Sequence, residues 1–219
     1  MNSRTMRFVI STVFLAVCVS LGQSQDKIPI GGIVYNYVGH VYIDPTTGTG
    51  EVAGYFASIA GIENPFADPV HPSEGNAFFT YKSDRLQFTN LPADVDTGIT
   101  LLNSGNWHIY FNPSPNGNWN DPDSFSQGQL IADLNHNALE LVSTGAGHQG
   151  VFSGELLASY EFTYVNGKEF DFGKFFPDGI TNFSSATNTT LAHGVPGFAV
   201  VFADAGWAVA KGHARRPRN

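Results

Sequence analysis

Short runs of β-branched and aromatic residues, separated by turn residues at close intervals, constrain the fold of this chain more than any other feature. Examples are IVYNYVGHVYI (33–43), EVAGYFASIAG (51–61) and NWHIYF (106–111), each bounded by Gly, Pro, Asn or Asp. Such runs are typical of many short strands joined by tight turns. The pattern predicts an all-β fold, a small antiparallel β-barrel, with a β-sandwich as the alternative that periodicity leaves open.

Two segments refine this prediction. In EFTYVNGKEFDF (161–172), Asn166 and Gly167 stand between alternating arms and predict a hairpin. In QLIADLNHNALELV (129–142) the apolar residues also fit helical spacing. Because Asn-His-Asn is a poor helix centre, we favour two strands that form a hairpin around it.

The N-terminus predicts secretion. Arg4 and Arg7 precede an uncharged apolar run over residues 8–21, which small residues follow. This is the pattern of a secretory signal peptide, and the run is shorter than the roughly 20 residues that a membrane span needs. We therefore expect a signal peptide over 1–24, with Cys18, the only cysteine, inside it.

The remaining chain is predicted to hold one β-barrel domain over 25–212 and a disordered basic tail over 213–219. Without cysteine, the mature protein has no disulfide and no thiol nucleophile. A formal net charge of −8 argues against nucleic acid as a partner, since phosphate backbones attract basic surfaces. No second apolar run is long enough to span a membrane. The sequence leaves open whether the protein forms a homo-oligomer.

The sequence GAGHQG (145–150) fits the G-x-G-x-x-G spacing of a dinucleotide-binding loop. Such a loop needs a helix after it, so that the helix N-terminus faces the pyrophosphate. Here Gly150 is followed by VFSGELLASYEFTYVNG, which carries another glycine and then alternates. We therefore predict that residues 145–154 form a β-turn connecting antiparallel strands, that no helix begins at Gly150, and that the protein uses no cofactor.

The same stretch, TGAGHQGVFSGELLASYEF, resembles the T-G-G-x-G-x-F-x-G-A-x-G turn of the allene oxide cyclase and dirigent proteins. The resemblance implies an eight-stranded barrel whose apolar cavity folds a hydrophobic substrate and controls its stereochemistry, without metal or organic cofactor. The family's catalytic residues do not match one by one, and none is carried over. The matching positions are Thr144, Gly145, Gly147, Phe152 and Gly154, with His148 and Gln149 as an apparent insertion.

His108 and Tyr110 are the first candidate catalytic residues. In NWHIYF the apolar Trp107, Ile109 and Phe111 alternate with these two polar side chains. In a barrel we expect His108 and Tyr110 to line the cavity and move a proton, while the other three pack outward. The alternative is that His108 and Tyr110 face solvent.

Two carboxylates are the next candidates. Asp133 in IADLN and Glu155 beside the glycine-rich turn could act as general acids if the barrel enclosed them, because burial raises the pKa of a carboxyl group. Exposure on a strand is the alternative. Asn182 in NFS and Asn188 in NTT are glycosylation acceptors if the source is eukaryotic. The histidines show no H-x-x-x-H or H-x-H spacing, so no metal site is predicted.

Two functions from different classes fit these observations. The first is a secreted β-barrel that binds a hydrophobic small molecule and acts as a cofactor-independent cyclase or isomerase. The second is a non-catalytic secreted β-sandwich that binds glycans or another surface through exposed aromatic residues and loops. The glycine-rich turn and the apolar final strand favour the barrel.

Overall fold

The computed structural model describes residues 27–44, 46–91, 98–102, 105–135, 139–144, 147–187, 195–198 and 200–212. Over these residues the chain is almost entirely strand and turn, with one four-residue helix, α1 (Phe172–Phe175), and the 3₁₀ turns η1 (Glu74–Asn76) and η2 (Pro122–Ser126). The predicted all-β class is confirmed. None of the helices in this part of the chain is long and apolar enough to cross a membrane.

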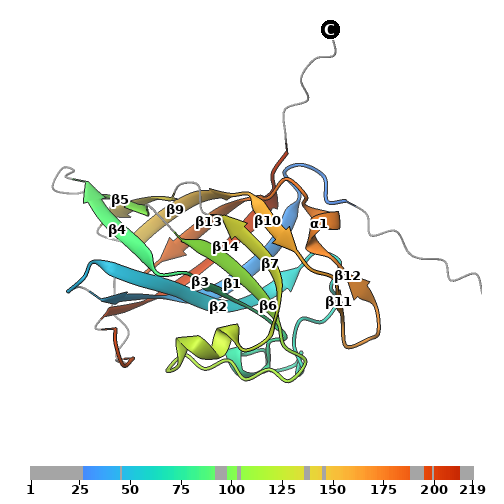
Figure 1. Ribbon diagram of the computed structural model, residues 1–219. Coiled ribbons are helices and arrows are strands. Elements are labelled where there is room, and N and C mark those ends of the chain that lie inside the picture. The colour runs from blue at the N-terminus through green and yellow to red at the C-terminus, as the bar shows by residue number, and fades with distance from the viewer. Residues whose placement is uncertain are drawn as a thin grey trace, which may run out of the picture.

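The main sheet curls until its pairings form a ring, which makes the molecule an antiparallel β-barrel (Figure 1). Each strand of the ring pairs with a neighbour on both edges, so the sandwich alternative is wrong. The order around the ring is β1 (Ile33–Asp44), β14 (Val200–Ala210), β13 (Ile180–Ala186), β9 (Gly147–Gly154), β8 (Leu139–Thr144), β5 (Gly98–Leu102), β4 (Leu86–Leu91) and β2 (Thr49–Ile59), which pairs with β1 again.

Four further strands lengthen one side of this wall. They are β3 (Phe79–Ser83), β6 (Asn106–Phe111), β7 (Gln129–Asn135) and β10 (Leu156–Ser159), and they pair in that order, with β3 joined to β2. The predicted hairpin over 129–142 is therefore wrong. Its two halves are strands, but β7 pairs with β6 and β10, whereas β8 pairs with β5 and β9. These two successive strands therefore belong to different parts of the wall.

The glycine-rich stretch lies in an antiparallel pair of strands, as predicted, but residues 147–154 are themselves a strand, so the β-turn predicted over 145–154 is wrong in its extent. β8 and β9 pair antiparallel from Leu139 with Phe152 to Thr144 with Gly147, and residues 150–154 belong to β9. No helix begins at Gly150, so there is no helix N-terminus to receive a pyrophosphate. The Asn166-Gly167 hairpin is also confirmed, with β11 (Phe162–Thr163) paired to β12 (Glu169–Phe170) and Gly167 at a φ of 80°.

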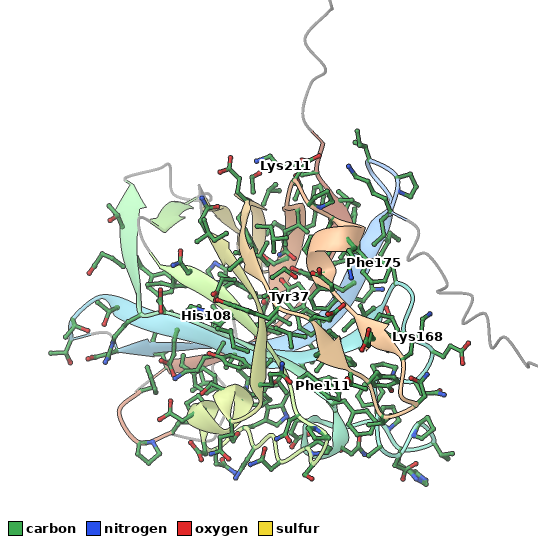
Figure 2. The ribbon with its side chains drawn as sticks, turned by 45° about the vertical axis from the view of Figure 1, so that its right-hand side comes forward. Tyr37, His108, Phe111, Lys168, Phe175 and Lys211 are labelled. Atoms are coloured by element: carbon green, nitrogen blue, oxygen red, sulfur yellow. The ribbon has the colours of Figure 1, made fainter. Side chains whose placement is uncertain are left out.

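Aromatic rings from different parts of the wall meet inside the barrel. Tyr81 of β3 stacks on Trp107 of β6 with 5.0 Å between ring centroids, and Trp107 lies 4.9 Å from Phe152 of β9. Tyr37 of β1 meets Tyr81 edge-on at 5.4 Å and lies near the centre of the molecule in Figure 2. These four side chains are all buried, and they form the middle of the hydrophobic core.

The two ends of the barrel differ. At one end, the segment that carries β11, β12 and α1 adds a group of buried aromatic side chains to the same core (Figure 1). At the other end, where β4 and β5 lie, Val41 and Phe88 pack against the core but remain partly exposed. Among the described residues, the α1 end of the barrel is therefore filled with aromatic side chains. The added aromatic residues are Phe162, Tyr164, Phe170, Phe172, Phe175 and Phe176.

A second, smaller core lies on the outside of the wall. The polar loop over 112–128 folds back over β2 and β3 through η2, where Phe125 is fully buried. Thr80 donates a hydrogen bond of 2.6 Å to the carbonyl oxygen of Phe125, and Trp119 stacks on His40 at 3.9 Å between ring centroids. Trp119 therefore covers the outer wall.

Candidate functional site

The structure reverses the predicted orientation of β6. Trp107, Ile109 and Phe111 point into the barrel and are almost completely buried, whereas His108 and Tyr110 lie on the outer face. The expectation that His108 and Tyr110 line the cavity is therefore wrong. The physical reason is that the three apolar side chains have more apolar surface than the other two, and facing the core removes that surface from water.

His108 joins two carboxylates on this outer face. Its Nδ1 lies 2.5 Å from Oδ1 of Asp133, and its Nε2 lies 3.0 Å from Oδ1 of Asp84. Asp84 also accepts the backbone N–H of Asn106 at 2.9 Å. The structure thus brings together two predicted residues, His108 and Asp133, and adds Asp84, which sequence reasoning missed. We call these three residues the outer clamp.

The charges of the outer clamp favour a protonated imidazole. Burial alone would lower the pKa of His108, but the hydrogen bonds to Asp84 and Asp133 outweigh it and raise that pKa. Burial opposes ionisation of Asp84 as well, yet its bonds to His108 and Asn106 lower its pKa. The clamp ties β6 to β7 and to the break between β3 and β4. A catalytic role for His108, Tyr110 or Asp133 stays a prediction.

The remaining predicted residues lie apart from the outer clamp. Glu155 follows β9 on the surface, where its carboxylate is about half exposed and 3.7 Å from Nζ of Lys211. Asn182 of β13 is fully buried inside the barrel, and its Nδ2 donates to the hydroxyl of Tyr37 at 3.1 Å. A glycan has no room on a buried amide, so the glycosylation predicted at Asn182 is incompatible with this fold. Asn188 lies outside the described residues.

A cluster of polar residues lies in the middle of the barrel's interior. Asp204 of β14 is buried, and the Tyr37 hydroxyl and the backbone N–H of Ala205 act to lower its pKa. Burial nevertheless dominates and raises the pKa of Asp204 to about 7. Ser184 of β13 also lies beside the Tyr37 hydroxyl, where it acts to lower the pKa of Tyr37 against the larger effect of burial. An acid that holds its proton near neutrality therefore lies inside an aromatic barrel.

Three side chains that contact Tyr37 each carry a buried polar atom with no hydrogen-bond partner among the residues that the structure describes. They are the hydroxyl of Tyr81, Nε1 of Trp107 and Oδ1 of Asn182. Leaving a buried polar group unpaired costs about 1–3 kcal/mol, so native interiors rarely keep several of them together. Their concentration around Tyr37 is the strongest sign of a binding site among the described residues. We call Asp204, Tyr37, Asn182, Tyr81 and Trp107 the interior site.

Glycines in the wall make room for the two phenols of the interior site. A Cβ atom at Gly39 would lie 2.0 Å from the hydroxyl oxygen of Tyr81, and one at Gly206 would lie 2.6 Å from that of Tyr37. Both phenols therefore lie directly over backbone that carries no side chain. Glycine inside a strand weakens it and often marks such a close approach.

The sequence held two signals for the interior site that our reasoning passed over. Gly39 interrupts a strand otherwise rich in bulky residues, and Gly206 does the same in the final strand. Asp204 is the one charged residue in GFAVVFADAGWAVA (197–210). A lone carboxylate in a run apolar on both faces is either exposed at an edge or buried with a raised pKa.

Two more rings lie on the inward faces of β9 and β14. Alternation along β9 puts His148 on the same inward face as Phe152, and the His148 ring meets Phe202 of β14 edge-on at 5.7 Å. Both rings are half-buried, and burial lowers the pKa of His148.

The interior site contains the parts needed for acid–base chemistry. Asp204 can take up or release a proton near pH 7, while the unpaired donors can hold an oxygen atom. Among the described residues, no group of His, Cys, Asp and Glu has an arrangement that could hold a metal ion.

In comparisons with protein-family models, curated proteins and solved structures, nothing matches this chain.

Proposed function

We propose that this protein is a secreted β-barrel that binds a hydrophobic small molecule at the interior site and isomerises or cyclises it without a cofactor. One observation carries the proposal: three side chains around Tyr37 carry buried polar atoms without a partner among the described residues, close to an acid of raised pKa and inside an interior that is otherwise apolar.

Binding follows from the mixture of groups at the site. Ligand pockets are mostly apolar, with a few placed polar groups that fix orientation. A molecule with an apolar body would contact the rings of Tyr37, Trp107 and Phe152, and one polar group on it would pair the orphaned atoms. Each pairing would recover part of the cost of about 1–3 kcal/mol that an unpaired buried group carries.

Proton transfer is the chemistry that Asp204 supports. General acid–base catalysis is most efficient when the pKa of the group lies near the working pH, and burial brings that of Asp204 to about 7. Isomerisation and ring closure that need only proton movement require no redox group. The resemblance of the turn at 144–154 to the allene oxide cyclase and dirigent proteins implies chemistry of this cofactor-free kind.

Titration with a neutral fluorescent dye, N-phenyl-1-naphthylamine, tests the binding. We expect saturable binding that Ser184→Phe abolishes, because residue 184 faces inward beside Tyr37 and a phenyl group there fills the site. The matched control is Ser185→Phe on the next residue, whose exposed side chain accepts a hydrogen bond from Gln149 on the outer face. If both variants bind the dye as the original protein does, the interior is not the binding site.

One observation favours the non-catalytic alternative, in which the outer wall binds a glycan or another surface. Trp207 of β14 is 42% exposed and stacks on Phe183 of β13 at 4.4 Å between ring centroids. Val151 of β9, also exposed, is paired with Phe183 in the sheet. We propose this row as the second candidate site. Binding of a neutral oligosaccharide that Trp207→Ala abolishes would support it over the interior site.

A further inference from the structure

We propose that the molecule bound at the interior site is an apolar ketone or aldehyde. Its carbonyl oxygen accepts hydrogen bonds from Tyr81 and Trp107, and Asp204 moves a proton at the carbon beside the carbonyl. This inference rests on the proposed function and adds the substrate class and the reacting bond.

The two unpaired donors come from one part of the wall. Tyr81 and Trp107 are on adjacent strands, β3 and β6, and their rings stack almost parallel, at 12°. An indole N–H can only donate, so Trp107 requires an acceptor on the ligand. A carbonyl oxygen has two lone pairs and accepts from an N–H and an O–H together. An apolar molecule without such an oxygen would leave both donors unpaired.

Asp204 and Tyr81 face one another across a floor without side chains. In the sheet, Asp204 pairs with Gly39, Gly39 with Gly54, and Gly54 with Tyr81, so the four residues form one row across β14, β1, β2 and β3. The hydroxyl of Tyr81 reaches back over Gly39, the direct neighbour of Asp204. Paired Cα atoms in antiparallel sheets are about 4.5–5.5 Å apart. The phenol and the carboxyl group therefore flank the same small region.

The electrostatics agree with this closeness. After burial, the charge of Asp204 is the largest influence that raises the pKa of Tyr81, and the same charge raises the pKa of Tyr37. Yet the Tyr81 hydroxyl has no hydrogen-bond partner among the described residues, Asp204 included. The two groups are thus close without being bonded to each other, which leaves both for a ligand placed between them.

The proposed step balances without any further reactant. The Asp204 carboxylate takes a proton from the carbon beside the carbonyl, and the C–H electron pair forms a C=C bond. The carbonyl π pair moves to the oxygen, where the O–H of Tyr81 and the N–H of Trp107 stabilise the negative charge. Asp204 then returns its proton to the same carbon or to another carbon of a conjugated system. The net change is an isomerisation, with no oxidation or reduction.

Deuterium exchange on 2-acetonaphthone tests this step with the intact protein. In D₂O, proton removal replaces the methyl hydrogens of the ketone by deuterium, which NMR detects. We expect the protein to raise the exchange rate above that of buffer by about 10²-fold or more. Asp204→Asn should return the rate to that of buffer, and Tyr81→Phe should lower it by about 10²-fold.

Tyr42→Phe is the matched control for loss of a phenolic hydroxyl. Tyr42 is also fully buried, but its hydroxyl bonds to the carbonyl of Trp119 in the outer core. It should leave the exchange rate unchanged. Circular dichroism spectra and melting curves of all variants check that each is folded.

Binding of 2-isopropylnaphthalene, which has the same shape without the oxygen, separates this inference from the proposed function. The ketone should bind about tenfold more tightly, and Tyr81→Phe should remove the difference. Equal binding of both compounds, with no exchange, would overturn the carbonyl assignment and leave interior binding standing. Exchange that persists in Asp204→Asn would overturn the role of Asp204. If neither compound binds, the proposed function fails together with the inference.

Discussion

At the scale of single residues, the interior site depends on a costly arrangement. Asp204 is kept in a place where its charged form is poorly solvated, and the Tyr37 hydroxyl offsets that cost only in part. Groups with strongly raised pKa concentrate at functional sites, because catalysis needs the reactivity that stability would remove. This cost lowers the free energy of unfolding, so measurements of stability can detect it.

Asp204→Asn should stabilise the protein at pH 8 and change little at pH 4. The folded pKa of Asp204, about 7, lies above the ordinary value of 3.8, so the folded state keeps a proton that the unfolded chain has lost. Stability from this group therefore falls as the pH rises from about 4 to 7, by about 4 kcal/mol in total at about 1.4 kcal/mol per pKa unit. Urea unfolding at both pH values measures it. An equal or lower stability of the variant at pH 8 would contradict the raised pKa.

Gly39→Ala should displace the Tyr81 phenol and weaken dye binding. The added methyl group would lie 2.0 Å from the Tyr81 hydroxyl oxygen and 3.0 Å from the carbonyl oxygen of Ala53. Overpacking of this kind costs about 1–3 kcal/mol. Gly75→Ala is the control, because its nearest neighbour would be 3.7 Å away. Thermal melts and dye titrations of both variants compare them, and unchanged dye binding in Gly39→Ala would remove Tyr81 from the site.

At the scale of elements, β6 shows what alternation can and cannot predict. The period of two correctly separates Trp107, Ile109 and Phe111 from His108 and Tyr110. It does not say which face points inward, because a polar face can line a cavity or contact other polar groups outside. The decisive partners, Asp84 and Asp133, come from other strands, and their positions depend on the pairing of the sheet.

His108→Ala should destabilise the protein at pH 6 more than at pH 9. The pKa of His108 is raised in the folded state, so its contribution is fully present below the ordinary value of 6.5 and is lost as the pH rises through the folded pKa. The lowered pKa of Asp84 keeps the clamp intact until the pH falls below 3.8. Because Asp84 is half exposed, we expect a difference of about 1 kcal/mol.

Tyr110→Phe on the same outer face is the control for this prediction. Its phenol pKa is raised above 10.0, so it does not titrate between pH 6 and 9. Denaturant unfolding of both variants at the two pH values gives the comparison. A loss in His108→Ala that is the same at pH 6 and pH 9 would mean that packing, and not charge, holds the clamp together.

Trp119→Ala should open the outer core and release His40. Burial lowers the pKa of His40 to about 4, and the indole of Trp119 stacked on its ring supplies part of that cover. Without the indole, the pKa should move toward 6.5, and stability should fall by about 2–3 kcal/mol. An NMR titration of the histidine ring protons follows the change. A pKa that stays near 4 would show that other residues bury His40.

At the scale of the whole molecule, local signals predicted the strands and the turns, and long-range pairing set the rest. The strands over 33–43, 51–61 and 106–111 and the turn at Asn166-Gly167 follow from residues close in sequence. The ring closes where β2 meets both β1 and β4, and the interior site combines Tyr37 with Asn182 and Asp204. Contacts between segments so distant in sequence leave no local pattern. The sequence therefore predicts the fold class but not the interior site.

The indole N–H signals of the three tryptophans give the most direct test of the interior site, since each residue lies in a different part of the molecule. Trp107 is inside the barrel, Trp119 is in the outer core and Trp207 is exposed on the outer wall. A ¹⁵N NMR titration with 2-acetonaphthone should shift the Trp107 signal strongly and saturably, with Trp207 unmoved. A shift of Trp207 or Trp119 with Trp107 unmoved would contradict a binding site inside the barrel.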